Sequence, residues 1–307
     1  MRIVFFGTPA FAEASLRALL AAGFGVAGVV TQPDRSQGRS RSTLVPPPVK
    51  LLAESAKVPV LQPDRPTGDL FLAALRRFNA DLGVVVAYGH ILKQPVLETP
   101  RLGMVNVHAS LLPRLRGAAP VQWAIANGDA ETGVSIMQMD AGMDTGPVLA
   151  RTATPIGPDE TGGELTARLA TLGAETLVGI LPDIARGTAR GEPQDDALAT
   201  VASKIGHATA RIDWTAPADV VARRIRAFDP VPGAWTVLDG AEVKLAGARA
   251  ARGSGRPGEV LATGGRLLVA AGRGGVEIAT AQPSGRKRLT AAEWTRGRGI
   301  AAGSRFA

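Results

Sequence analysis

Short apolar runs alternate with amphipathic stretches along the first half of the chain. The runs with the length and composition of buried strands are residues 4–6, 26–30, 82–86 and 104–107. Between the first two lies a stretch of helical periodicity at about residues 10–22, and Pro9 stands at its start, where a helix tolerates proline. Strands that alternate with helices in this way predict an α/β domain built on a mostly parallel sheet.

The longest connection in this half is the segment 31–50, which is polar, basic and rich in proline. Connections in α/β units are usually about 2–6 residues long, so a loop of this length is expected to be functional or disordered. Further along, residues 160–188 have the pattern of a long helix, which we predict to be broken near Pro182.

The polar segment 187–203 separates this region from a second half with a different pattern. After a helix predicted at about residues 216–227, brief apolar runs stand between glycines at 235–238, 243–245, 260–261, 267–269 and 276–278. Short strands with glycine turns predict a small β-barrel, which we expect to be of the oligonucleotide-binding (OB) type. The chain is therefore expected to comprise a larger domain over residues 1–188, a linker over 189–204 and a smaller domain over 205–307.

The positive charge of the chain lies in its last third. Of the formal net charge of +8, residues 1–200 contribute −1, with 18 basic and 19 acidic side chains, and residues 201–307 contribute +9, with 17 and 8. A near-neutral segment followed by a strongly basic one is typical of an enzyme domain joined to a surface that attracts a polyanion such as nucleic acid. A genome that favours arginine over lysine is the alternative explanation of the excess.

Composition excludes several kinds of chemistry. The chain has no cysteine, which removes disulfides, thiolate metal sites and a cysteine nucleophile, and His90, His108 and His207 lack the spacing of zinc ligands. We therefore expect no metal. The opening segment MRIVFFGTP lacks the apolar stretch of a signal peptide, and no apolar run reaches the roughly 18 residues of a membrane span. A cytoplasmic, monomeric protein without membrane contact is expected.

Two segments carry residues suited to catalysis. Asn106 and His108 stand at the C-terminal end of a predicted strand, and Asp144 stands on a glycine-flanked loop that follows another. Ligands bind at such positions in open α/β sheets. Because side chains alternate along a strand, Asn106 and His108 are expected to project to the same face. These three groups suit acyl transfer to an amine. The amide can stabilise an oxyanion, the imidazole can move a proton, and the carboxylate can fix the charge of the imidazole.

Each of these residue types also has a purely structural use. Asp140 and Asp144 among glycines suit turns or helix caps, Asn106 suits a turn cap, and a histidine at a strand end suits a structural hydrogen bond. Ser110 is a rival nucleophile, but no G-x-S-x-G elbow surrounds it. The spacing alone leaves both uses open.

Three stretches of the chain together resemble the formyltransferase family that uses 10-formyltetrahydrofolate. They are Asn106 to Pro113, Asp140 to Pro147 and the opening Phe6 to Pro9. The resemblance implies a Rossmann-like first domain without a dinucleotide, and Gly7-Thr8-Pro9 departs from the dinucleotide motif G-x-G-x-x-G. It implies 10-formyltetrahydrofolate as the co-substrate and Asn106, His108 and Asp144 as the catalytic residues. The folate contacts that it implies are Ala87, Tyr88, Gly89, Ser110, Leu111, Leu112, Pro113 and Asp140.

The second half resembles the branch of this family that formylates methionyl-tRNA. The resemblance rests on residues 210–214, 225–230, 232–235 and 282–288 and on the long loop 31–50. It implies formylation of the α-amino group of methionine on initiator tRNA, with the loop at the acceptor end and the basic barrel on the phosphates. The expected tRNA contacts are Arg39, Arg41, Lys204, Arg286, Lys287 and Arg288. Ser40 and Ser42 interrupt the basic run of the loop, where the chain departs from the family pattern.

Two other functions are compatible with parts of the pattern. The same catalytic residues could formylate a small amine, such as a sugar nucleotide or a purine precursor, although such an enzyme has no use for a segment of charge +9. The second alternative is an inert RNA-binding protein built on an enzyme scaffold. The presence of Asn106, His108 and Asp144 together argues against it.

Overall fold

The computed structural model of the chain describes residues 1–37, 43–298 and 300–307. The described residues form two compact units. The first unit comprises residues 1–117, 133–154 and 166–201, and the second comprises residues 118–132, 155–165 and 202–307.

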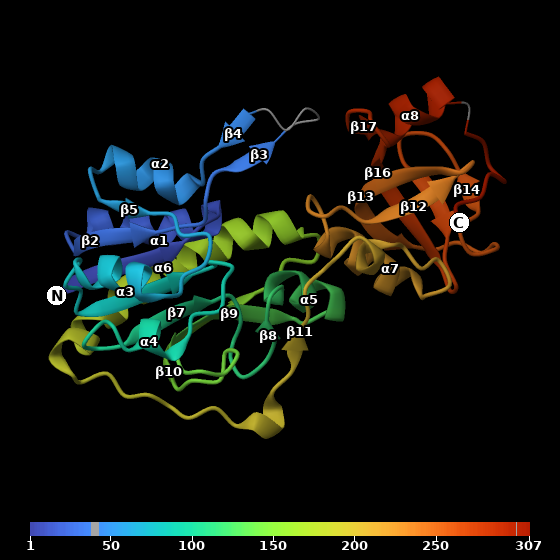
Figure 1. Ribbon diagram of the computed structural model, residues 1–307. Coiled ribbons are helices and arrows are strands. Elements are labelled where there is room, and N and C mark those ends of the chain that lie inside the picture. Colours follow the sequence, from blue (N-terminus) through green and yellow to red (C-terminus); the bar gives the residue numbers. More distant parts are fainter. Residues whose placement is uncertain (38–42, 299) are drawn as a thin grey trace. The chain divides into compact units, whose positions relative to one another are not determined.

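The first unit is built on a sheet with the strand order β10-β9-β7-β6-β1-β2-β5 (Figure 1). Its strands are β1 (Arg2–Gly7), β2 (Gly25–Val30), β5 (Val60–Leu61), β6 (Leu82–Val86), β7 (Met104–His108), β9 (Glu131–Gln138) and β10 (Val148–Pro155). Pairing is parallel from β5 through β2, β1 and β6 to β7, and β9 runs antiparallel to β7. The mostly parallel sheet predicted from the apolar runs is confirmed.

Helices cover both faces of this sheet, which is why its strands are apolar on both sides. In β1, Ile3 and Phe5 pack into the core on one face, and Val4 and Phe6 pack into the core on the other. The first face is covered by α1 (Ala10–Ala21), α2 (Pro48–Ser55) and α6 (Gly162–Arg186), and the second by α3 (Asp69–Arg76) and α4 (Gln94–Leu97).

The long helix α6 is not broken at Pro182, so that prediction was wrong. The helix runs from Gly162 to Arg186 with Pro182 inside it. A proline removes one helical N–H bond and crowds the carbonyl four residues earlier, which usually ends or kinks a helix. Leu177, Leu181 and Ile184 are buried in the core on either side of the proline. This burial holds the last turns of α6 in helical register.

Within the long loop, β3 (Arg35–Gln37) pairs antiparallel with β4 (Thr43–Val45). At its base, Nζ of Lys50 lies 2.8 Å from Oδ2 of Asp34, and Nε2 of Gln62 donates to Oδ1 of Asp34 at 2.7 Å. The hydrogen bond from Gln62, together with the ammonium of Lys50, holds the pKa of Asp34 below its usual value. The predicted tRNA contacts Arg39 and Arg41 lie outside the described residues.

The second unit is built on an antiparallel sheet with the strand order β12-β13-β16-β15-β14, with β17 paired to β16. Its strands are β12 (Trp235–Leu238), β13 (Ala241–Ala251), β14 (Val260–Ala262), β15 (Leu267–Ala270), β16 (Gly275–Pro283) and β17 (Leu289–Thr290). Every apolar run predicted as a strand in this half forms one. The OB type of this sheet stays a prediction.

Helix α7 (Ala218–Ala227) matches the helix predicted near residues 216–227 and packs against β13 and against α5 (Pro120–Asn127). Helix α5 belongs to the second unit although it precedes the predicted linker, and the boundaries at 188 and 204 stay a prediction. The remaining elements are β8 (Arg116–Gly117), η1 (Asp196–Leu198), β11 (Val201–Ala202), η2 (Ala208–Ala210) and α8 (Ala291–Arg298). No helix in the described ranges is long and apolar enough to cross a membrane.

Candidate active site

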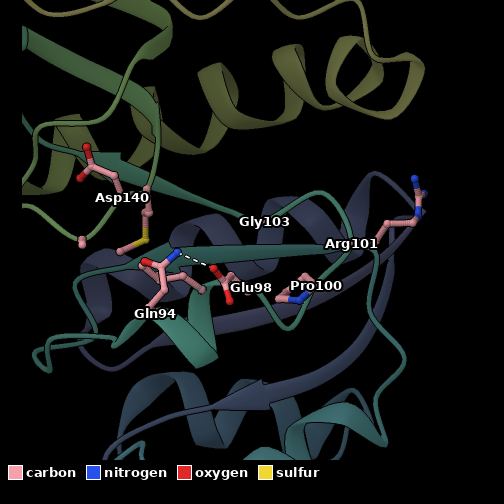
Figure 2. A pocket seen from close by; sticks show the side chains of 9 residues that line it. Gln94, Glu98, Pro100, Arg101, Gly103 and Asp140 are labelled. Atoms are coloured by element: carbon pink, nitrogen blue, oxygen red, sulfur yellow. Dashed lines mark hydrogen bonds between the residues drawn. The ribbon is translucent and has the colours of Figure 1, made fainter.

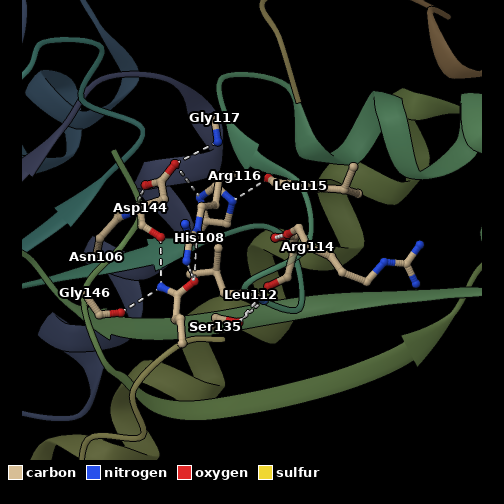
Figure 3. A network of polar contacts seen from close by, with 12 residues as sticks. Asn106, His108, Leu112, Arg114, Leu115, Arg116, Gly117, Ser135, Asp144 and Gly146 are labelled. Carbon is tan, nitrogen blue, oxygen red and sulfur yellow. Dashed lines mark hydrogen bonds and ion pairs between the residues drawn. The ribbon is translucent and has the colours of Figure 1, made fainter. Parts of the chain in front are cut away.

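Asn106, His108 and Asp144 converge at the C-terminal end of β7 (Figure 3). Nδ2 of Asn106 lies 3.5 Å from Oδ1 of Asp144, and Nδ1 of His108 lies 3.7 Å from Oδ2 of the same carboxylate. The side chains of His108 and Asp144 are 6% and 17% exposed. The structure therefore brings together the residues that the sequence singled out, while their catalytic roles stay a prediction.

The hydrogen bonding of His108 determines which ring nitrogen can accept a proton. Nε2 lies 3.0 Å from the carbonyl oxygen of Leu115. Because a carbonyl can only accept, Nε2 carries the hydrogen, and in the neutral ring Nδ1 keeps its lone pair. The distance of 3.7 Å from Nδ1 to Oδ2 of Asp144 is longer than a hydrogen bond. The carboxylate of Asp144 therefore faces, without a hydrogen bond, the ring nitrogen that is free to take up a proton.

Asp144 is held in an unusual backbone conformation, with a φ of 57° in the left-handed region. A non-glycine residue keeps such a conformation only where its surroundings impose it. Here the backbone N–H of Gly117 donates to Oδ2 of Asp144 at 2.8 Å. Nε2 of Gln194 donates to the carbonyl oxygens of Asp144 at 2.8 Å and of Gly146 at 2.7 Å. Both the carboxylate and the backbone of Asp144 are thus fixed.

Asp140 and Gly146 shape the loop that carries Asp144. Oδ1 of Asp140 accepts from the backbone N–H of Gly142 at 3.0 Å and from the hydroxyl of Thr145 at 2.8 Å, which is the bonding of a turn-forming aspartate. A Cβ on Gly146 would lie 1.8 Å from the carbonyl oxygen of Gln138, closer than any side chain permits. The structural use proposed for Asp140 is therefore observed.

The turn at residues 110–113 is held by hydroxyl groups. The hydroxyl of Ser110 donates to the carbonyl of Arg114 at 2.6 Å. The hydroxyl of Ser135 donates to the carbonyl of Ser110 at 2.7 Å and accepts from the N–H of Leu112 at 3.0 Å. Ser110 and Leu112 are buried, whereas Leu111 and Pro113 are half-buried. The Ser110 hydroxyl thus serves the turn and is bonded to a carbonyl rather than to a base.

The side chain of Tyr88 belongs to the core, and its backbone carbonyl accepts two hydrogen bonds. Its ring is 2% exposed and meets Phe6 edge to face at 5.4 Å. Burial raises the pKa of Tyr88 to about 12, so its hydroxyl stays neutral at physiological pH. Its carbonyl accepts from the hydroxyl of Thr8 at 3.1 Å and from Nε2 of Gln32 at 2.8 Å. The neighbouring Ala87 and Gly89 are exposed.

A hollow of about 400 Å³ lies between α4 and the start of the Asp144 loop (Figure 2). It is lined by Gln94, Leu97, Glu98, Pro100, Arg101, Gly103, Met139, Asp140 and Ala141. The hollow shares Asp140 with the loop that carries Asp144, but none of Asn106, His108 and Asp144 lines it. Within the part of the chain that the structure describes, no cluster of histidine, aspartate or glutamate side chains is arranged to hold a metal ion.

The basic residues predicted to contact tRNA differ in their surroundings. Lys204, Arg286 and Lys287 are exposed, and the structure shows no ion pair between them and the other described residues. Arg288 is instead paired with Asp229, with its guanidinium 2.6 Å from the carboxylate. Asp229 is only 9% exposed. Arg288 therefore neutralises a buried carboxylate, which leaves Arg286 and Lys287 as the unpaired cations among the described residues of this turn.

Comparison with known proteins decides the family. A family profile described as formyl transferase matches residues 1–181, and one described as the formyl transferase C-terminal domain matches residues 204–299. The chain belongs to the formyl transferase family. The family resemblance drawn from the sequence is confirmed.

Alignments with similar members of the formyl transferase family cover nearly the whole chain. A methionyl-tRNA formyltransferase of Pseudomonas paraeruginosa is 50% identical over 294 residues, which cover 95% of this chain and 94% of the relative. One of Myxococcus xanthus is 49% identical over 304 residues, which cover 99% and 97%. Among solved structures, HypX from Aquifex aeolicus in complex with tetrahydrofolic acid has a TM-score of 0.66 at 21% identity, and the match covers 96% of this chain and 47% of that one.

For this member of the formyl transferase family, sequence reasoning missed the residues that support the site. Leu115 and Gly117 contact His108 and Asp144 through backbone atoms, which no side-chain pattern reveals. Gln194 lies in the segment expected to be a linker, where nothing in the surrounding polar residues marked it. Arg116 was identifiable only by its position just after the turn at residues 110–113, and it proves to be buried.

Proposed function

We propose that the chain transfers the formyl group of 10-formyltetrahydrofolate to the α-amino group of methionine on initiator tRNA, giving N-formylmethionyl-tRNA for translation initiation. The observation that carries the proposal is the convergence of Asn106, His108 and Asp144 at one strand end. The relatives named methionyl-tRNA formyltransferase, at 50% and 49% identity, support this acceptor. The basic second half supports it as well.

In the first step, the acceptor amine attacks the formyl carbon and the formyl oxygen becomes negative. Nδ2 of Asn106 donates to this oxygen, a contact worth about 2.7–4 kcal/mol in comparable sites. The reference pKa of an α-amino group is about 7.7–8.0, so about a tenth of it is already neutral at pH 7. Stabilising the oxyanion is therefore a larger task for the protein than deprotonating the free amine.

In the second step, the proton of the newly attached nitrogen moves to the leaving group. Nδ1 of His108 takes this proton, and Asp144 stabilises the imidazolium that forms. The ring then gives the proton to N10 of the folate as the bond between N10 and the formyl carbon breaks. The products are a formamide and tetrahydrofolate, with no net change in protons.

The folate contacts are proposed from the resemblance and from the positions of the residues. They comprise Ala87, Tyr88 and Gly89, the turn Ser110–Pro113, and Asp140. The hollow beside Asp140 extends this site. The tetrahydrofolic acid bound to a structural neighbour of similar fold is consistent with a folate co-substrate.

The tRNA contacts are proposed on Arg39 and Arg41 in the long loop and on Lys204, Arg286, Lys287 and Arg288 beyond it, where Arg288 also pairs with Asp229. We further propose that the chain has an OB-type second domain over 205–307, joined to the catalytic domain 1–188 by residues 189–204. The protein is proposed to be a cytoplasmic monomer that needs no metal.

The direct test is formyl transfer from 10-formyltetrahydrofolate to initiator methionyl-tRNA. Free methionine and elongator methionyl-tRNA serve as acceptor controls. We expect formylation of the initiator species at a kcat/KM far above that of either control. A chain that formylates a sugar nucleotide or another small amine in preference to methionyl-tRNA would contradict the proposal.

A further inference from the structure

We propose that residues 192–200, here called the positioning segment, hold the catalytic residues in register: Gln194 fixes the Asp144 loop, and Thr200 fixes the turn that orients His108. The inference rests on the proposed function, because it assigns these residues a role in the same reaction. Most of this segment is exposed and it carries little regular structure. Its contacts are nevertheless concentrated on the catalytic site.

The positioning segment is anchored at its first residue. The backbone of Glu192 pairs with that of Val148, with both N–H···O distances at 2.9 Å. Its carboxylate lies 2.5 Å from the guanidinium of Arg151. Val148 is the first residue of β10, the strand that follows the Asp144 loop. The anchor therefore places the next residues beside that loop.

Both the nitrogen and the oxygen of the Gln194 side-chain amide form hydrogen bonds at the site. Nε2 has two hydrogens to donate, and it donates to the carbonyls of Asp144 at 2.8 Å and of Gly146 at 2.7 Å. Oε1 accepts from Nε of Arg116 at 3.0 Å and from its terminal nitrogen at 2.9 Å. Because a guanidinium only donates, Arg116 determines which end of the amide faces the loop.

Arg116 itself is locked by its surroundings. It is 9% exposed, and its guanidinium also lies 2.8 Å from the carboxylate of Asp196, within the positioning segment. The side chain that orients Gln194 is therefore buried and charge-paired. Gln194 in turn supports the left-handed backbone of Asp144, whose φ is 57°.

Thr200 contacts Leu115, whose carbonyl is the other partner of His108 beside Asp144. Its hydroxyl accepts from the N–H of Leu115 at 2.8 Å, and its carbonyl accepts from the N–H of Arg116 at 2.8 Å. Leu115 has a φ of 57°, so its conformation also needs support. The Leu115 carbonyl is the acceptor for Nε2 of His108. The positioning segment thus fixes both groups that determine the state of the imidazole.

The test replaces Gln194 by a side chain of equal shape. Gln194→Glu exchanges the donating nitrogen for an oxygen that faces two carbonyl oxygens, so the Asp144 loop should shift. Because a small misplacement of a catalytic group is costly, we expect kcat to fall by about 10–100-fold, while KM for both substrates changes by less than about twofold. Thr200→Val removes the acceptor for Leu115 and keeps the shape of the side chain. It should likewise lower kcat and leave KM nearly unchanged.

Thr188→Val is the matched control for Thr200→Val, because Thr188 lies outside the positioning segment, is exposed, and its hydroxyl donates to Asp183. It should keep the wild-type kcat. A readout without catalysis is hydrogen exchange of residues 139–147 measured by mass spectrometry. Exchange there should be faster in Gln194→Glu than in wild type or Thr188→Val.

Unchanged kcat or unchanged exchange in Gln194→Glu would overturn the inference, and so would a parallel decrease of kcat, substrate binding and thermal stability. A wild-type chain without formyl transfer activity would contradict the proposed function instead. The exchange measurement would still decide whether Gln194 holds the loop.

Discussion

The Nδ1 atom of His108 lies 3.7 Å from Oδ2 of Asp144, while Nε2 of the same ring is bonded to the carbonyl of Leu115 at 3.0 Å. One nitrogen of the ring is thus hydrogen-bonded to the backbone, and the other faces a carboxylate. This arrangement suits a residue that carries a proton for part of a reaction cycle, because the bonded nitrogen keeps the ring in place while the other can accept and release a proton.

Removing any member of the catalytic trio should affect the chemical step. We expect Asn106→Ala, His108→Ala and Asp144→Ala each to lower kcat by at least about 100-fold, because these groups act mainly in the transition state. Folate binding and melting temperature should stay close to the wild-type values. Single-turnover formylation with saturating methionyl-tRNA measures the effect. Near wild-type kcat in one variant would show that its residue has another role.

The loop that carries Asp144 should not tolerate a side chain at Gly146. In Gly146→Ala the new Cβ would lie 1.8 Å from the carbonyl of Gln138, so the loop must move. We expect kcat to fall by about 10–100-fold. Gly179→Ala is the control, because no atom lies within 4 Å of its Cβ, and it should keep full activity. Equal kinetics in the two variants would mean that the loop position does not limit the reaction.

The exposed cations Arg286 and Lys287 should contribute to tRNA affinity through phosphates. In the full-length double variant Arg286→Ala and Lys287→Ala, the slope of log affinity against log salt should become shallower by roughly 0.7–0.9 for each phosphate that is no longer neutralised. The control is the pair Arg76→Ala and Arg77→Ala, exposed residues of the first unit. Fluorescence anisotropy at several salt concentrations gives both slopes. Identical slopes would remove Arg286 and Lys287 from the tRNA site.

Arg39 should act on tRNA and not on folate. We expect Arg39→Ala to raise KM for methionyl-tRNA and to leave folate affinity unchanged, because a loop arginine at a phosphate positions the substrate. Initial rates across a tRNA concentration series measure the change, with Ser40→Ala as the control in the same loop. Equal rates for wild type and Arg39→Ala throughout the series would exclude the residue from the tRNA site.

Arg288 should matter for stability. Arg288→Met leaves the carboxylate of Asp229, which is 9% exposed, without its charged partner. We expect the free energy of unfolding to fall by about 1–3 kcal/mol. Arg286→Met, at an exposed position two residues away, should change it by less than about 0.5 kcal/mol. Denaturant unfolding of both variants makes the comparison, and equal stabilities would contradict it.

The sequence by itself determined the sheet and the face of β7 that carries Asn106 and His108. Buried strands must be apolar, so the runs at β1, β2, β6 and β7 were visible without coordinates. Alternation along β7 was enough to place Asn106 and His108 on one face, and the motif residues indicated the family. These properties are local, because they follow from the periodicity of an extended chain and from residues close in sequence.

The tertiary structure alone decided what holds the site together. Gln194 reaches Asp144 and Gly146 from a polar segment that gave no signal, and Arg288 turns from a free cation into the partner of Asp229. Pro182 stays inside a helix because flanking side chains are buried against the sheet. Each outcome depends on contacts between residues far apart in the chain. Such contacts form only when the whole fold brings them within a few ångströms, so no local pattern could specify them.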